Sequence, residues 1–141
     1  MVRALRATFP KRDILYVGDT ARVPYGNKSA ETVQNYSREI VDFLEQKGAE
    51  RVVAACNTAS ALAVASLAKT RKIPVHGMIE SGVTAALATG EGPVGVIGTP
   101  ATIASGAISK PWQKPSRDCA WWRRPHRCLC RWWRKAGWRG K

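Results

Sequence analysis

The chain has 141 residues, which is long enough for one domain with a hydrophobic core. It contains no apolar run of about 18 residues, which excludes a transmembrane helix. The first residues also lack the apolar stretch of a secretory signal. We therefore expect a cytoplasmic protein without membrane contact, whose cysteines are free rather than paired.

The net charge of +13 is unevenly distributed along the chain. Residues 1–110 contain 13 basic and 9 acidic residues, a net charge of +4, whereas residues 111–141 contain 10 basic residues and 1 acidic residue, a net charge of +9. All six tryptophans and three of the four cysteines lie in the second part. The composition thus predicts a domain over 1–110 and a basic tail over 111–141.

In the first third of the chain, apolar spacing predicts a helix, a strand and a second helix. Residues 2–9 have helical spacing, and residues 13–18 form a short apolar run typical of a buried strand. A polar loop follows over residues 19–28. Ser29 is a suitable N-cap for the second helix and Gly48 a suitable end. The expected apolar stripe of that helix comprises Val33, Tyr36, Ile40, Phe43 and Leu44.

The alternation of strands and helices then continues to about residue 104. The pattern predicts strands over 51–55, 73–75 and 93–98, and helices over 57–68, over 81–88 and from Thr99. Alternating, mostly apolar strands are typical of an α/β fold, in which helices flank both faces of a parallel sheet. Ligands bind such sheets outside the carboxyl ends of the strands.

Cys56 lies where a predicted strand meets a predicted helix. The N–H groups of a helix N-terminus favour a thiolate and can also hold a carboxylate. Asn57 and Thr58 add polar side chains at the same end. A simpler interpretation is an inert buried cysteine followed by two helix-capping residues, and position alone does not decide between the two.

Two long motifs carry a resemblance to a known family. Asp-Thr-Ala-Arg-Val-Pro-Tyr-Gly occupies residues 19–26, and Ala-Cys-Asn-Thr-Ala-Ser occupies residues 55–60. Gly-Met-Ile-Glu-Ser-Gly at 77–82 and Gly-Val-Ile-Gly-Thr-Pro-Ala-Thr-Ile-Ala-Ser-Gly at 95–106 follow in order. Over residues 2–110 the chain resembles the glutamate racemases of the Asp/Glu racemase superfamily. A related amino-acid or hydantoin racemase stays an alternative.

The resemblance implies a cofactor-independent isomerase that makes D-glutamate for peptidoglycan and so serves cell-wall biogenesis and cell shape. In this family two cysteines flank the α-carbon of glutamate; one removes the α-proton and the other returns a proton to the opposite face. By this resemblance Cys56 is one of the catalytic pair, and Tyr25, Gly26, Asn57 and Thr58 bind substrate. No cofactor and no metal are implied, and the intact family member is expected to be a homodimer.

The chain departs from the family pattern at both ends. The family begins with a strand that carries Asp-Ser-Gly, whereas this chain begins in the helix that would follow it. The second catalytic cysteine belongs to a Cys-Thr-His motif, which does not occur here. These departures predict a truncated and catalytically inactive fragment.

The tail over 111–141 has three interpretations. Its cysteines and His126 could bind zinc, although they lack the usual spacing. Its interleaved Arg and Trp could bind nucleic acid, which would make the chain a non-catalytic module. We favour a third: loss of one base near Lys110. The shifted frame forces alanine across Trp112–Gln113 and leucine or valine at three other codon junctions, all residues that suit a racemase core. Neither a metal nor nucleic acid is then expected as a partner.

Overall fold

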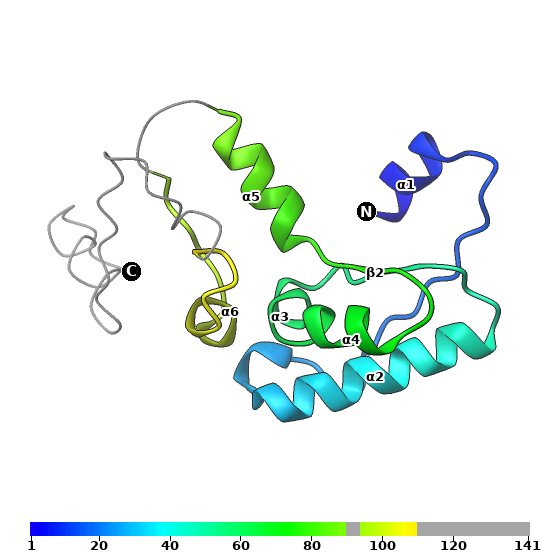
Figure 1. Cartoon of the computed structure of the whole chain (residues 1–141), viewed down its shortest axis with the longest axis horizontal. Helices are drawn as coiled ribbons and strands as arrows, with labels where there is room; N and C mark the ends of the chain where they lie inside the picture. The colour runs from blue at the N-terminus through cyan, green and yellow to red at the C-terminus, as the bar shows by residue number, and fades with distance from the viewer. Residues whose placement is uncertain (90–93, 110–141) are drawn as a thin grey trace, which may run out of the picture.

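The computed structural model describes residues 1–89 and 94–109, so the predictions for the tail and its cysteines lie outside the described residues. Within that part the fold is rich in helices and contains a two-stranded parallel sheet, which confirms the predicted α/β class (Figure 1). The strands are β1 (Val52–Val53) and β2 (Val75–His76), paired Val52 to Val75 and Val53 to His76. No helix in the described part is long and apolar enough to cross a membrane.

Helix α2 (Ala30–Gln46) forms as the sequence predicts. The Ser29 hydroxyl accepts a hydrogen bond from the backbone N–H of Thr32 at 3.1 Å, and Glu31 lies in the first turn, where the helix dipole favours an acid. Gly48 has a φ of 83°, which glycine adopts freely and which ends the helix. The buried face differs from the predicted stripe, because Ser37 is buried and Phe43 is 44% exposed.

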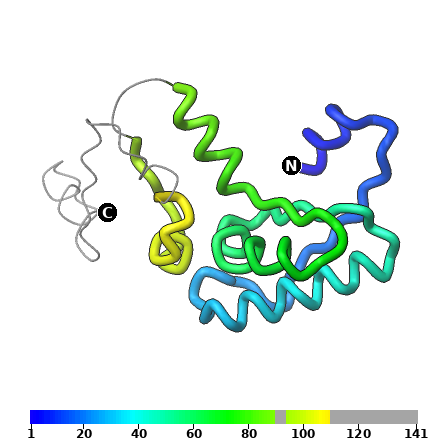
Figure 2. The backbone as a smooth tube through the Cα atoms, in the orientation of Figure 1, coloured from blue at the N-terminus to red at the C-terminus, as the bar shows by residue number. Residues whose placement is uncertain are grey.

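The second large helical segment runs continuously over residues 57–70. It comprises α3 (Asn57–Ala59), the π-helical turn η2 (Ser60–Val64) and α4 (Ala65–Thr70). The tube in Figure 2 shows it beside α2, and α2 contacts the η2 turn directly. The core lies between these helices and one face of the sheet, and it comprises Val41, Leu44, Val52, Ala63, Leu67 and Val75.

The remaining helices are short. Helix α1 (Val2–Thr8) contributes no buried residue to the core. Helix α5 (Ile79–Leu87) follows β2, and α6 (Pro100–Ala104) begins at the N-cap Thr99, as predicted. The 3-10 turn η1 (Tyr25–Asn27) stands just before α2. Helices α1 and α5 agree with the predicted ranges to within about two residues, whereas η1 lies in the segment predicted as a loop.

Two of the four predicted strands are not formed. Residues 13–18 and 94–98 have no strand structure, and Leu15 and Tyr16 are 50% and 71% exposed. A strand requires a neighbour for its backbone N–H and C=O groups. No backbone hydrogen bond among the described residues joins 13–18 to another strand. The apolar run could not indicate whether a pairing strand is present.

Candidate active site

The site is built where η1, α3 and α6 meet, since each of these three elements contacts the other two. The η1 turn carries Tyr25 and Gly26, and α3 carries Asn57 and Thr58 directly after Cys56. The structure therefore brings the two predicted loops together, although they are about 30 residues apart in the sequence. Helix α6, from the motif at 95–106, completes the group.

The loop that precedes η1 is held by Asp19. The Tyr25 hydroxyl donates a hydrogen bond to one carboxylate oxygen of Asp19. The Nε atom of Arg22 lies 2.8 Å and 3.0 Å from the two carboxylate oxygens of the same residue. Asp19 thus closes the loop on itself and fixes the Tyr25 ring.

These contacts shift the pKa values of Asp19 and Tyr25 in opposite directions. Burial raises the pKa of Asp19, but the hydrogen bonds from Tyr25 and Arg22 outweigh it, so the pKa lies below its ordinary value. Burial raises the pKa of the Tyr25 phenol, and its hydrogen bond to Asp19 raises it further. A negative charge on Cys56 adds a smaller effect in the same direction, which is consistent with a thiol near the Tyr25 ring. At neutral pH the pair is a carboxylate that accepts from a neutral phenol.

Cys56 stands at the N-terminus of the 57–70 helical segment. Its backbone is extended, and its carbonyl accepts the first helical hydrogen bond, from the Ser60 N–H at 2.8 Å. The thiol is free and exposed, so the interpretation as a buried cysteine is wrong, and the catalytic role of Cys56 stays a prediction. It is the only cysteine in the described part of the chain. Asn57 beside it is also exposed.

Thr58 points inward and joins a cluster of three hydroxyl groups. Its Oγ1 lies 3.0 Å from that of Thr99 and 3.3 Å from that of Thr102, and the last two are 2.9 Å apart. Thr58 and Thr102 are almost fully buried. A Cβ atom added to Gly26 would lie 2.6 Å from the Thr99 methyl group, so only glycine fits at this contact. The cluster therefore joins α3 to α6, and the close approach of Gly26 to Thr99 adds η1 to the group.

Sequence reasoning missed three residues of this arrangement: Ser60, Thr99 and Thr102. A signal existed for Thr99, because a threonine before Pro100 is a typical N-cap followed by proline in the first turn. The Ser60 hydroxyl accepts a hydrogen bond from the backbone N–H of Met78 after β2, and no sequence signal indicates this contact. Contacts of this kind depend on tertiary structure.

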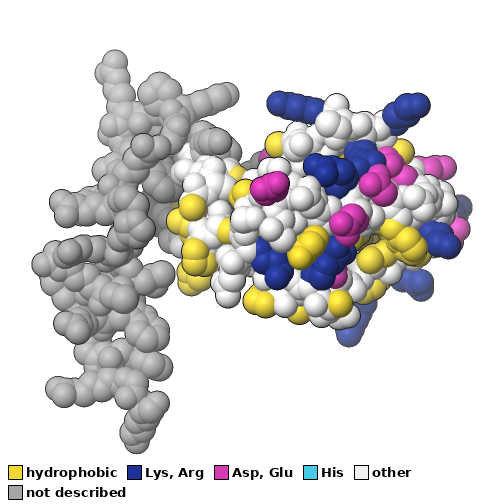
Figure 3. Space-filling model, turned by 90° about the horizontal axis from the view of Figure 1, so that it is seen from below, with side chains coloured by type: hydrophobic (Ala, Val, Ile, Leu, Met, Phe, Trp, Pro, Cys, Tyr) yellow, Lys and Arg dark blue, Asp and Glu magenta, His cyan; other side chains and the backbone are white. Residues whose placement is uncertain are grey.

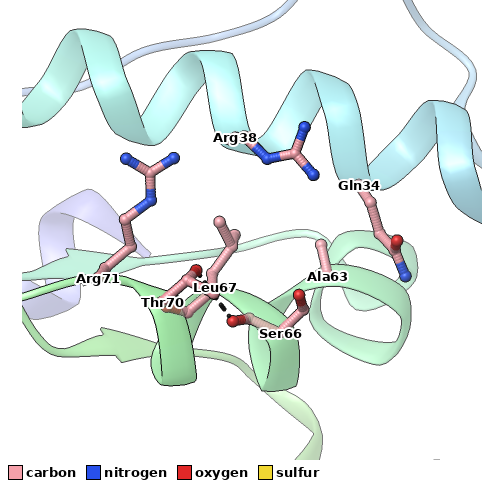
Figure 4. A pocket seen from close by; sticks show the side chains of 7 residues that line it. All are labelled: Gln34, Arg38, Ala63, Ser66, Leu67, Thr70 and Arg71. Carbon is pink, nitrogen blue, oxygen red and sulfur yellow. Dashed lines mark hydrogen bonds between the residues drawn. The ribbon is translucent and has the colours of Figure 1, made fainter.

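Two cavities among the described residues have linings that do not include Cys56. The larger, about 250 Å³, is a groove between α2 and the 57–70 segment, and its lining residues are Gln34, Arg38, Ala63, Ser66, Leu67, Thr70 and Arg71 (Figure 4). The other, about 240 Å³, lies beside Arg22 and Phe43. The described residues leave Cys56 exposed. They also contain no group of three metal-ligating side chains.

The charge pattern of the visible face is mixed. Figure 3 shows acidic and basic side chains interspersed on the face that α2 covers, with apolar groups between them. A continuous basic stripe, the usual electrostatic footprint of nucleic-acid binding, is not seen on this face.

The sequence profile of the Asp/Glu/hydantoin racemase family matches residues 1–115. The chain belongs to this racemase family. Among curated relatives, the glutamate racemase of Aquifex pyrophilus is 47% identical over 119 residues, which cover 84% of this chain and 47% of the relative. That of Geobacter metallireducens is 50% identical over 111 residues, or 78% of this chain and 41% of the relative. The chain spans less than half the length of these two relatives.

Solved structures of racemases agree with this assignment. The Aquifex pyrophilus glutamate racemase has a TM-score of 0.74 and 50% identity, with 77% of this chain and 43% of that chain covered. The Francisella tularensis enzyme, solved in complex with D-glutamate, has a TM-score of 0.69 and 40% identity over 77% of this chain and 40% of that chain. The matched part of this chain therefore has the same fold as the corresponding part of these enzymes.

Proposed function

We propose that the chain belongs to a glutamate racemase in which Cys56 is one of two thiols that exchange the α-proton, and that the 141-residue chain alone does not complete the interconversion of L- and D-glutamate. The observation that carries the proposal is the exposed Cys56 thiol at the N-cap of α3, a helix that contacts the η1 turn of Tyr25 and Gly26. Relatives at 40–50% identity that are named glutamate racemase support glutamate as the substrate.

The helix N-terminus gives the site two chemical abilities. Its N–H groups and the positive end of its dipole attract a carboxylate group of an amino acid. A thiolate next to a bound α-carbon can act as general base, and the same N–H groups can stabilise the charge that develops when the proton leaves. Asn57 and the η1 backbone add hydrogen-bonding groups beside the thiol.

A neutral Tyr25 phenol suits a site of this kind. Its hydroxyl hydrogen is held by Asp19, so the phenol adds no negative charge beside a thiolate. Asp19 in turn is neutralised by Arg22. The acidic group nearest to Tyr25 is therefore compensated, and a dicarboxylate ligand would meet little repulsion from it.

The proposal further includes a peptidoglycan-related role, no cofactor, and a homodimer as the state of the intact protein. The mechanism supplies the reason for the absent cofactor, because two positioned thiols can transfer the proton in both directions without an electron sink. Light scattering of the intact protein would test the dimer.

Protection of Cys56 from alkylation tests the proposal directly. Iodoacetamide labelling of Cys56 is expected to slow when D- or L-glutamate is added, because a bound amino acid covers the thiol. D-aspartate and a hydantoin serve as comparison ligands. Equal protection by all of them would favour another member of the family, and no protection by any would contradict an amino-acid site. Mass spectrometry of the peptide with Cys56 separates its labelling from that of the other cysteines.

A further inference from the structure

Two arginines in the described part each bridge two carboxylates, and in both cases α2 supplies at least one. Arg22 contacts Asp19 and Glu39, and Arg71 contacts Asp42 and Glu45. Glu39, Asp42 and Glu45 all belong to α2. The two networks are similar, since each consists of one arginine and two carboxylates, but they differ in the further residues that they contact. Only the Arg22 network continues to a residue of the candidate active site, Tyr25.

Burial makes Asp19 the stronger of the two partners of Arg22. Its side chain is 12% exposed, compared with 63% for Glu39. Solvent screens an exposed ion pair and leaves it weak, whereas a charged hydrogen bond to a mostly buried carboxylate keeps more of its strength. The contact with Glu39 then tethers the loop to α2, and the contact with Asp19 sets the loop conformation.

Arg22 also fixes the aromatic groups around the loop. Its guanidinium lies 4.3 Å from the centre of the Tyr36 ring, which projects from α2. The Tyr36 and Tyr25 rings are 6.0 Å apart at an interplanar angle of 54°. One side chain therefore contacts the loop carboxylate, the helix and an aromatic ring that packs against Tyr25. Removal of Arg22 would therefore remove these contacts around the η1 turn.

We infer that Arg22 and Asp19 are positioning residues that anchor Tyr25 and Gly26 beside Cys56 for binding of the amino-acid substrate. Neither residue needs to touch the substrate, because their effect passes through the Tyr25 ring and the η1 backbone. This inference rests on the proposed function, since it assigns the anchor to the same amino-acid site.

The chain offers a matched control for this inference. Arg22→Gln and Asp19→Asn remove the anchor, and Arg71→Gln removes the similar network that does not reach the site. The affinity of the full chain for D-glutamate is measured by NMR titration. Arg22→Gln is expected to weaken binding by about tenfold, the effect of losing one charged hydrogen bond. Arg71→Gln is expected to bind as the wild type does, and Arg22→Lys to be intermediate, because lysine cannot span both carboxylates with a planar fork.

A second measurement needs no ligand. The Lys28 backbone N–H donates to the Tyr25 carbonyl at 3.1 Å, so its hydrogen exchange reports on the η1 turn. Exchange at Lys28 is expected to be faster in Arg22→Gln and Asp19→Asn than in the wild type, and unchanged in Arg71→Gln. If one of the two anchor variants does not fold, which circular dichroism would show, the other provides the result.

The outcomes separate the anchor from the proposed function. Exchange at Lys28 that stays at the wild-type rate in the folded anchor variants would overturn the inference. Anchor variants that bind D-glutamate as tightly as Arg71→Gln would also overturn it. If the wild-type chain binds no D-glutamate while the anchor variants still accelerate exchange at Lys28, the proposed function fails and the structural anchor holds.

Discussion

The Ser60 hydroxyl accepts a hydrogen bond from the backbone N–H of Met78 at 3.0 Å. It also donates to the Ala54 carbonyl at 3.1 Å. Ser60 therefore links the end of β1, the first turn after Cys56 and the loop after β2. A Cβ atom added to Gly77 would lie 2.9 Å from Ser60 Cβ, so glycine at 77 permits this approach.

Ser60→Ala is expected to lower the free energy of unfolding by about 1–3 kcal/mol, because it leaves a partly buried N–H and a carbonyl without their partner. Urea unfolding followed by circular dichroism measures the change. Ser66→Ala serves as the control, since Ser66 is an exposed serine in the same helical segment. Equal stability of the two variants would show that the Ser60 contacts contribute nothing measurable.

Gly26→Ala is expected to destabilise the chain by about 1–3 kcal/mol through overpacking against Thr99. It is also expected to weaken D-glutamate binding, because η1 must move. Gly82→Ala is the matched control: no atom lies within 4 Å of its added Cβ, and Gly82 lies inside α5, where alanine should stabilise by about 0.5–1 kcal/mol. Opposite signs of the two effects are the expected result, and a stabilised Gly26→Ala variant would contradict the contact with Thr99.

The Asp19–Tyr25 pair predicts how stability depends on pH. The pKa of Asp19 is lowered in the folded state. The ionised Asp19 therefore adds to the free energy of unfolding above the pKa of the unfolded chain, about 3.9, and this stabilisation is lost as pH falls through the folded pKa. The pKa of Tyr25 is raised in the folded state. The neutral phenol therefore adds to the free energy of unfolding below the pKa of the unfolded chain, about 10, and this stabilisation is lost as pH rises through the folded pKa.

Asp19→Asn is therefore expected to be less stable than the wild type at pH 7, and the difference should shrink below about pH 4 as the wild-type carboxylate becomes protonated. Urea unfolding of both proteins over this pH range measures it. A difference that stays constant from pH 7 to pH 3 would show that the charge of Asp19 does not stabilise the fold.

Local patterns in the sequence predicted most of the elements. The two ends of α2, at Ser29 and Gly48, were predicted correctly, because helix capping and a positive φ depend on neighbouring residues alone. The run over 13–18 was predicted as a strand, but pairing depends on a second segment that its own sequence does not specify. Phe43 is exposed because the helix turns Ser37 and Val41 toward the core instead.

The candidate site was predicted mainly from motifs that resemble a known family, and only partly from the chemical properties of its residues. Cys56, Tyr25, Gly26, Asn57 and Thr58 lie on the two loops that the fold brings together, and their roles stay predictions. The hydroxyl cluster around Thr102 and the Arg22 contact with Glu39 were not predicted. Both join residues at least 17 positions apart, so no local pattern encodes them.

The last prediction concerns how much of the reaction one thiol can perform. Inversion at the α-carbon requires removal of a proton on one face and delivery of a proton to the other. Cys56 can serve one face, and the described residues supply no second cysteine opposite it. A thiol that returns a solvent-derived hydrogen to the same face exchanges the α-hydrogen without inversion. In D₂O, the 141-residue chain is therefore expected to label the α-position of only one glutamate enantiomer and to form no D-glutamate from L-glutamate.

Mass spectrometry of the α-position and chiral chromatography measure the two activities, with Cys56→Ala as the control. Cys119, Cys128 and Cys130 lie outside the described residues, and the expectation assumes that none is positioned opposite Cys56. Lack of positioning can cost about 7–11 kcal/mol of the barrier reduction, which is enough to make racemisation undetectable. D-glutamate formation clearly above the control would show that a second acid acts on the opposite face. Absence of labelling in both enantiomers would instead remove Cys56 as the base.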